Sequence, residues 1–274
     1  MKQLIALAFL LISIEAVAHP DSFMPDLSRG ISSLSVIDSG NIKITYILNQ
    51  LAQEPNKSDD IQILEIGQKL SKYYSYNIFR VDSLRTDVLK QNPNAQGVPG
   101  YGRLNFDKLF WSDYYKDYAT NEISEYAYMP RNIPNYQYSE NIDFDWQIQE
   151  DTRMIASYLC QRATCSFRGK NYTAWFSPDI PISNGPWKFG GLPGLILKVY
   201  DDRNDYVFEC IGIENRETRF PITSYYDHRD YKKIERKKLL KLWGDIFDHY
   251  CQIIGMTPDL FKKSKSPYKP IELE

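Results

Sequence analysis

Histidines and serines are the first residues to consider for chemistry in this 274-residue chain. A nucleophile–base pair needs a histidine or lysine against a serine or cysteine, and the three histidines are His19, His228 and His249. No GxSxG, HExxH or phosphate-loop pattern occurs. Ser183 and Asp179 bound a loop, where such residues usually serve turn chemistry. The sequence therefore favours a protein without catalytic activity, and a hydrolase-like enzyme is the alternative.

Four cysteines could form disulfides or hold a metal: Cys160, Cys165, Cys210 and Cys251. An even number in an oxidising compartment suggests disulfides, with three complete connectivities. Cys160 and Cys165 can pair only across a bend, since a straight strand would separate them by about 16 Å and bridged Cα atoms lie within about 7 Å. Pairing with another segment is equally open. Neither clustered histidines nor CxxC spacing is present, so we predict no metal and no cofactor.

The N-terminus reads MKQLIALAFLLISIEAVAHP. Lys2, an apolar run over residues 4–14 and Ala16-Val17-Ala18 are typical of a signal peptide cleaved after Ala18, and the run is too short to span a bilayer. We expect an exported protein, periplasmic or secreted, with no transmembrane segment in the mature chain. His19 would then become the N-terminal residue and could chelate copper, although we prefer a flexible terminus. The net charge of −2 gives no argument for nucleic acid.

The most informative stretch covers residues 180–199 and reads IPISNGPWKFGGLPGLILKV. A disordered linker would be polar, whereas this stretch is apolar and aromatic, which predicts a fixed loop on the core. Its glycines permit positive φ or close backbone approach, and its prolines restrict φ. The motif residues that we expect to shape this loop are Gly185, Pro186, Gly190, Gly191 and Gly194.

This stretch resembles the GLPGLI family, named for the hexapeptide at residues 191–196. The similarity extends upstream through Trp146, Tyr158-Leu159-Cys160, Ala163 and the run RGKNYTAWF at residues 168–176. It is specific over roughly residues 146–201 and weak elsewhere. The resemblance implies a secreted or envelope protein of a family found mostly in Bacteroidetes. It implies no particular biochemical activity.

Extended apolar runs, several of them with alternating apolar and polar residues, predict strands in several parts of the chain. We expect them over residues 41–51, 61–76, 142–148, 154–163, 172–176, 195–200 and 206–213, with turns at 150–153, 168–171 and 201–205. Short connections indicate an antiparallel meander. Residues 81–90 predict a helix with Asp82 as its N-cap, and apolar spacings of three and four over residues 230–255 predict a long amphipathic helix.

The expected fold is mainly β (α+β): a curved antiparallel meander or half-barrel whose concave face is covered by the long C-terminal amphipathic helix. We expect a signal peptide over residues 1–18, a single GLPGLI-type domain over 19–261, and a loose polar tail over 262–274.

The expected function is binding rather than catalysis. Aromatic and apolar loop residues could form a lip for a peptide, a lipid-like ligand or an outer-membrane transport partner, or they could serve as scaffold inside the sheet. The candidate binding residues are Trp175, Trp187, Phe189, Leu192 and Pro193. A structural or assembly protein is a further alternative, which would expose a large apolar patch.

Overall fold

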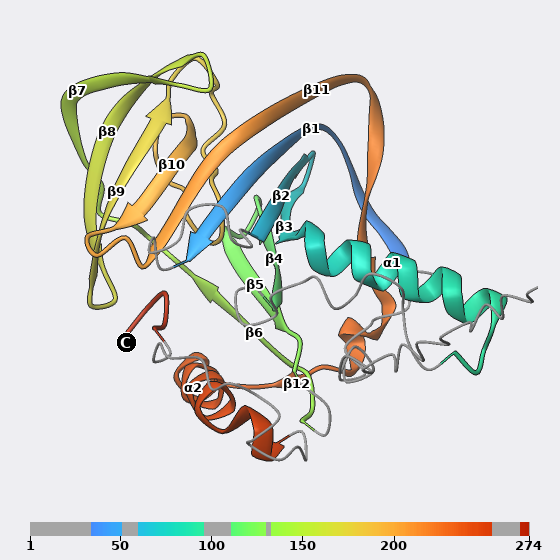
Figure 1. The fold of residues 1–274 in the computed structure, drawn as a ribbon. Helices are drawn as coiled ribbons and strands as arrows, with labels where there is room; N and C mark the ends of the chain where they lie inside the picture. The colour runs from blue at the N-terminus through green and yellow to red at the C-terminus, as the bar shows by residue number, and fades with distance from the viewer. Residues whose placement is uncertain (1–33, 51–59, 96–110, 130–132, 254–268, 274) are drawn as a thin grey trace, which may run out of the picture.

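A computed structural model describes residues 34–50, 60–95, 111–129, 133–253 and 269–273. All of the strands in these residues belong to one sheet (Figure 1). They are β1 (Leu34–Gln50), β2 (Asp60–Gly67), β3 (Leu70–Ser75), β4 (Ser112–Asp117), β5 (Glu122–Ala127), β6 (Tyr136–Asn141), β7 (Gln147–Ile155), β8 (Tyr158–Phe167), β9 (Lys170–Ser177), β10 (Leu195–Asp201), β11 (Tyr206–Tyr225) and β12 (Lys232–Lys233).

The sheet consists of two meanders joined by one long strand pair. The strand order is β12-β6-β5-β4-β3-β2-β1-β11-β10-β9-β8-β7, so β1 to β6 form one meander and β7 to β11 the other. The pairing of β1 with β11 joins them, and it runs from Leu34↔Tyr225 to Gln50↔Tyr206 with register shifts. The pair β12–β6 is parallel, which makes the sheet mixed.

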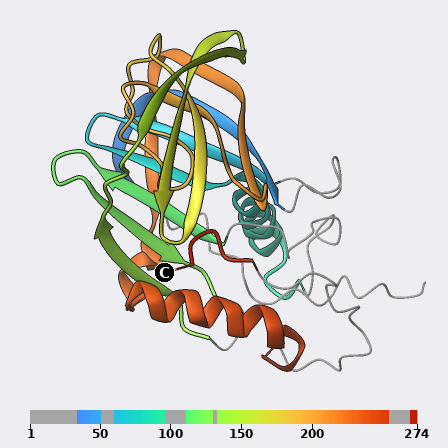
Figure 2. The ribbon, with the colours of Figure 1, turned by 90° about the vertical axis from the view of Figure 1, so that its left-hand side faces the viewer.

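The connection between β6 and β7 requires the sheet to curl. These strands stand ten places apart in the strand order, which corresponds to about 48 Å in a flat sheet. The chain joins them through residues 142–146 alone, a distance of at most about 21 Å. The two ends of the sheet therefore approach each other, and Figures 1 and 2 show the resulting curvature.

Helix α1 (Tyr76–Gln91) begins where β3 ends. Ser75 is its N-cap, because the Ser75 hydroxyl accepts a hydrogen bond from the backbone N–H of Ile78 at 3.2 Å. The buried residues Ile78 and Val81 face inward, and the helix packs against β2 and β3. The helix thus starts earlier than we expected, and the predicted N-cap, Asp82, is instead a buried helical residue that accepts a hydrogen bond from the Tyr225 hydroxyl at 2.9 Å.

The prediction of a half-barrel covered by a long C-terminal amphipathic helix is wrong. The described residues form one open, mixed sheet, with 54% of them in strands, and two α-helices. Helix α2 (Arg236–Ile253) is interrupted by non-helical backbone at His249, and it lies beside β12 and β6 (Figure 1). Its residues Leu239 and Ile246 pack against Ala127, Met129 and Tyr138. The physical reason is that residues 178–194, between β9 and β10, already fill the curved sheet.

Two local predictions also differ from the structure. Residues 142–146 are not a strand, although Ile142 and Phe144 are buried. The expected turn at 150–153 lies within β7, and the chain turns at Ala156 and Ser157, both of which have positive φ. Alternation of apolar and polar residues indicates an extended segment with one buried side. It does not indicate whether that segment pairs with a neighbouring strand.

The described cysteines carry free thiols and not disulfides. Cys160, Cys165 and Cys210 are buried and unbridged, and the side chain of Cys251 lies outside the described residues. Burial raises the pKa of Cys160 and Cys210 to about 11 and that of Cys165 to about 12. Because the thiolate is the reactive form, these thiols are inert at neutral pH.

The stretch that we predicted to be a loose polar tail, residues 262–274, is described only over residues 269–273. Within the described residues 269–273, Ile271 is 8% exposed and Glu272 is 2% exposed, and Ile271 belongs to the main core cluster.

No helix in the described part of the chain is both long and apolar enough to cross a membrane.

Candidate functional site

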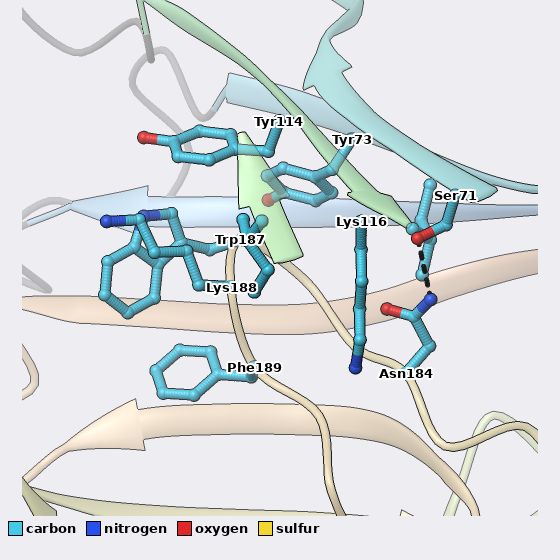
Figure 3. Close-up of a pocket in the computed structure, with 10 residues that line it drawn as sticks. Ser71, Tyr73, Tyr114, Lys116, Asn184, Trp187, Lys188 and Phe189 are labelled. Carbon is cyan, nitrogen blue, oxygen red and sulfur yellow. Dashed lines mark hydrogen bonds between the residues drawn. The ribbon is translucent and has the colours of Figure 1, made fainter. Parts of the chain in front are cut away.

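The loop over residues 178–194 enters the curve of the sheet and is held there by backbone and side-chain hydrogen bonds. Leu195 N donates to Ile180 O at 2.9 Å, and Ile196 N donates to Asn184 O at 3.0 Å. The Asn184 side chain donates to the Ser71 hydroxyl of β3 at 2.8 Å (Figure 3). These bonds attach the loop both to its own following strand and to the opposite side of the sheet.

Phe189 is the centre of the core that this loop builds. Its side chain is 1% exposed. Its ring lies 5.0 Å from those of Tyr172 and Trp187, 5.4 Å from that of Phe144 and 6.2 Å from that of Phe208, measured between centroids. These partners belong to β9, the loop, residues 142–146 and β11, so one ring joins four parts of the chain.

The two central glycines of the motif have different reasons to be glycine. A Cβ atom on Gly194 would lie 2.2 Å from the carbonyl oxygen of Ser177, which is backbone and cannot move aside. Gly191 has a φ of +84°, a conformation that other residues rarely adopt. The motif thus lets β10 begin directly beside the end of β9.

Four of the five predicted binding residues, including Trp175, belong to one core cluster, and the fifth is exposed. Trp187, Phe189 and Leu192 are 4%, 1% and 1% exposed and belong to one core cluster. Trp175 in β9 is 8% exposed, with the Arg153 guanidinium 4.0 Å from its ring centroid. Pro193 is exposed on the loop.

The motif residues Gly185, Pro186 and Gly190 are buried in the same loop. The carbonyl oxygen of Pro186 accepts a hydrogen bond from Phe189 N at 3.0 Å.

A small cavity of about 10 Å³ lies between the loop and the strands β2 to β5 (Figure 3). That volume suits about one water molecule. The residues that line it are Leu64, Ser71, Tyr73, Tyr114, Lys116, Ile123, Asn184, Trp187, Lys188 and Phe189. The loop therefore fills the space in which a curved sheet could have held a ligand.

Sequence reasoning missed the charge network around Lys188, whose side chain is 1% exposed. Its ammonium lies 3.1 Å from a carboxylate oxygen of Glu140, 3.1 Å from one of Glu272 and 3.4 Å from one of Glu125. It also donates to the Tyr138 hydroxyl, which in turn donates to Glu125 at 2.6 Å. The available signal was a lysine between two buried aromatic residues, since a buried charge requires partners.

Two arginines complete this network. Arg168, at the turn between β8 and β9, bonds the carboxylates of Glu140 and Glu272. Arg236, at the start of α2, lies 3.7 Å from Glu140 and 3.4 Å from Glu272. Three cations therefore balance three carboxylates, and the network joins β5, β6, the central loop, α2 and the C-terminal segment.

Burial and charge act in opposite directions on the groups of this network. Burial alone would lower the pKa of Lys188, but Glu125, Glu272 and Glu140 raise it above its ordinary value. Burial alone would raise the pKa of Glu140, but Arg168 and Lys188 hold it below its ordinary value. Lys188 therefore stays protonated at neutral pH and cannot act as a nucleophile.

A second cluster surrounds His228, which is 4% exposed. Its Nδ1 atom lies 3.0 Å from the hydroxyl oxygen of Ser224, and its Nε2 atom lies 3.7 Å from a carboxylate oxygen of Asp113 on β4. The ring stacks on Tyr126 with centroids 4.2 Å apart, and Tyr231 lies edge-on at 5.0 Å. The fold thus brings a serine, a histidine and an aspartate together.

Of the two other histidines, only His249 lies in the described part of the chain. The Nδ1 atom of His249 lies 3.1 Å from the backbone oxygen of Asp245 within α2, and His19 lies outside the described residues. Among the described residues, no group of three or more histidine, cysteine, aspartate or glutamate side chains could hold a metal ion.

Comparison with known proteins gives a short match to an uncharacterised family and a similarity in fold. Residues 167–198 match a family described as "Protein of unknown function (Porph_ging)". This match covers β9, the central loop and most of β10. No curated protein matches the chain.

Two crystal structures of PNGF-II are similar in fold. One, in space group P21, has a TM-score of 0.50 at 15% identity and covers 75% of this chain and 33% of its own. The other, in space group C2, has a TM-score of 0.49 at 15% identity, with 74% and 32% covered. The part of this chain that matches spans about a third of the length of PNGF-II.

Proposed function

We propose that this is an exported protein without catalytic activity that binds a partner protein or peptide on its surface. The observation that carries the proposal is the filled interior: residues 178–194 leave a cavity of only about 10 Å³ inside the curve. Among the described residues this cavity holds about one water molecule, so we place recognition on the outer surface. Export rests on the signal-peptide pattern of residues 1–18, and the similarity to the GLPGLI family agrees with it.

The surface best suited to a partner is the β7–β8 hairpin at the end of the sheet. Strand β7 is last in the strand order of the described residues. One side of its backbone therefore has no strand partner within that part of the chain and could pair with another chain. Met154 of β7 is 63% exposed and lies directly opposite Leu159 of β8, which is 51% exposed. Ile148, also on β7, is 48% exposed.

In vivo photocrosslinking tests this surface. With a photoreactive amino acid in place of Met154, we expect a crosslink to one discrete protein in the envelope of the source cells. The matched control is the same replacement at Leu84 on α1, an exposed apolar position at 43%, which we expect to give no such product. Equal products at both positions, or none at Met154 together with a small molecule retained in native mass spectrometry, would contradict the proposal.

A hydrolase is the second candidate, and the contact between Ser224, His228 and Asp113 is the observation that favours it. A histidine 3.0 Å from a serine hydroxyl can act as its general base. A fluorophosphonate probe decides between the candidates. Because His228 is enclosed by aromatic rings, we expect no labelling of the native protein, and labelling that disappears in Ser224→Ala would instead establish the hydrolase.

A further inference from the structure

The last described residues of the chain lie on the protein as a bound peptide would. Tyr206 donates from its hydroxyl to Lys269 O at 2.6 Å, Tyr172 donates to Ile271 O, and Leu273 N donates to Arg168 O at 3.0 Å. Backbone contacts at every second residue are typical of an extended peptide in a groove. Two successive side chains, Ile271 and Glu272, are buried at 8% and 2% exposure.

Glu272 occupies a socket that has an excess of positive charge without it. Its carboxylate contacts Lys188, Arg168 and Arg236. Without Glu272, these three cations would face only Glu125 and Glu140. Burial of unbalanced charge is costly, so the socket requires an anionic group from whatever peptide lies there.

We propose that this groove is a binding site for an extended peptide of a partner protein in which an apolar residue is followed directly by a glutamate or aspartate. The chain's own residues 269–273 occupy the site when the partner is absent. The apolar residue enters the core where Ile271 lies, and the acidic residue enters the socket of Glu272. This inference rests on the proposed partner binding and names the chemistry of one ligand.

Peptide exchange on the full chain tests the site. A protease site inserted between Lys263 and Ser264 allows the chain to fold intact before it is cut. The cut protein is then mixed with a tenfold excess of an isotope-labelled peptide of residues 264–274, and native mass spectrometry reads the bound peptide. We expect nearly complete exchange in the cut protein. In uncut protein we expect at least about tenfold weaker binding, because the attached tail competes at millimolar effective concentration.

Peptide variants test the recognition chemistry. A Glu272→Gln peptide is expected to bind about tenfold or more weakly, since it loses charge-assisted bonds in a buried socket. A Lys269→Gln peptide changes the other charged contact, a lysine side chain 36% exposed beside Asp205, and is expected to lose about twofold at most. Equal binding of the Glu272→Gln and natural peptides, or no exchange in the cut protein, would overturn the inference.

The remaining outcomes separate this inference from the proposed function. If uncut protein forms dimers in which residues 269–273 of each copy lie in the groove of the other, the ligand is a second copy of this chain. That result would overturn the proposal that the ligand is a peptide of a different protein. If exchange fails while crosslinks from Met154 persist, only the peptide site is withdrawn. If exchange succeeds and the crosslinks are absent, only the β7–β8 surface is withdrawn. Failure of both experiments removes partner binding altogether.

Discussion

Replacing Lys188 with methionine is expected to lower the free energy of unfolding by about 3–5 kcal/mol, because it leaves buried carboxylates without their central cation. The side chain is 1% exposed and contacts Glu125, Glu140 and Glu272. Urea unfolding followed by tryptophan fluorescence measures the change. Methionine retains most of the length of the side chain, so the loss reports charge more than packing.

The matched control is Lys198→Met. Lys198 forms a comparable ion pair with Glu209 at 2.6 Å, but the two side chains are 22% and 42% exposed. Such a pair contributes about 1 kcal/mol or less. Equal losses for the two variants would show that the Lys188 network is no more important than a surface pair.

The pH dependence gives a second check on the same variant. The pKa of Glu140 is lowered in the folded protein, so its contribution is present above about pH 4.3, the unfolded value, and is lost as the pH falls through the folded pKa. The pKa of Lys188 is raised, so its contribution is present below about pH 10.4 and is lost as the pH rises through the folded pKa. The difference between wild type and Lys188→Met should therefore be largest between about pH 5 and pH 10.

Gly194→Ala is expected to cost about 3 kcal/mol, because the new methyl group would lie 2.2 Å from the Ser177 carbonyl oxygen and one of the two backbone segments would have to shift. Thermal and urea unfolding measure the loss. A cost near zero would mean that the close approach of β9 and β10 is not needed for the fold.

Two other glycines provide graded controls for this prediction. Gly191→Ala meets no atom closer than 3.8 Å but must keep a φ of +84°, so we expect a loss of about 1 kcal/mol. Gly212→Ala in β11 has Thr45 as its nearest contact at 3.9 Å, and we expect a change within about 0.5 kcal/mol. The expected loss of stability is largest at Gly194, smaller at Gly191 and smallest at Gly212. This order separates the cost of steric overlap from the cost of backbone strain.

The sequence by itself determined the local elements with strong periodicity or turn chemistry. The strands β9 and β10, the turn at Arg168 and Gly169, and a helix following β3 all correspond to patterns of neighbouring residues. The apolar, glycine-rich stretch was also recognisable as part of the core. These features depend on interactions within a few residues, which sequence patterns report directly.

Only the tertiary structure decided which segment fills the curved sheet. The periodicity of residues 230–255 indicated one apolar helix face, and no pattern stated which surface that face would contact. The aromatic loop has more to bury, since Trp187, Phe189 and Leu192 are all nearly inaccessible, and it fills the space assigned to the helix. Alternation at residues 142–146 likewise indicated a buried side, without revealing that the segment only connects the two ends of the sheet.

The charge network was equally beyond the sequence. Glu125, Lys188 and Glu272 lie on three distant segments. The position of Lys188 between Trp187 and Phe189 was a local signal, but no local pattern indicated its partners. Burial changes their role. An ion pair exposed to water contributes little to the free energy of unfolding, whereas a buried charge that loses its partner strongly destabilises the fold. The sequence could supply the charges, and only the fold could show which of them must compensate one another.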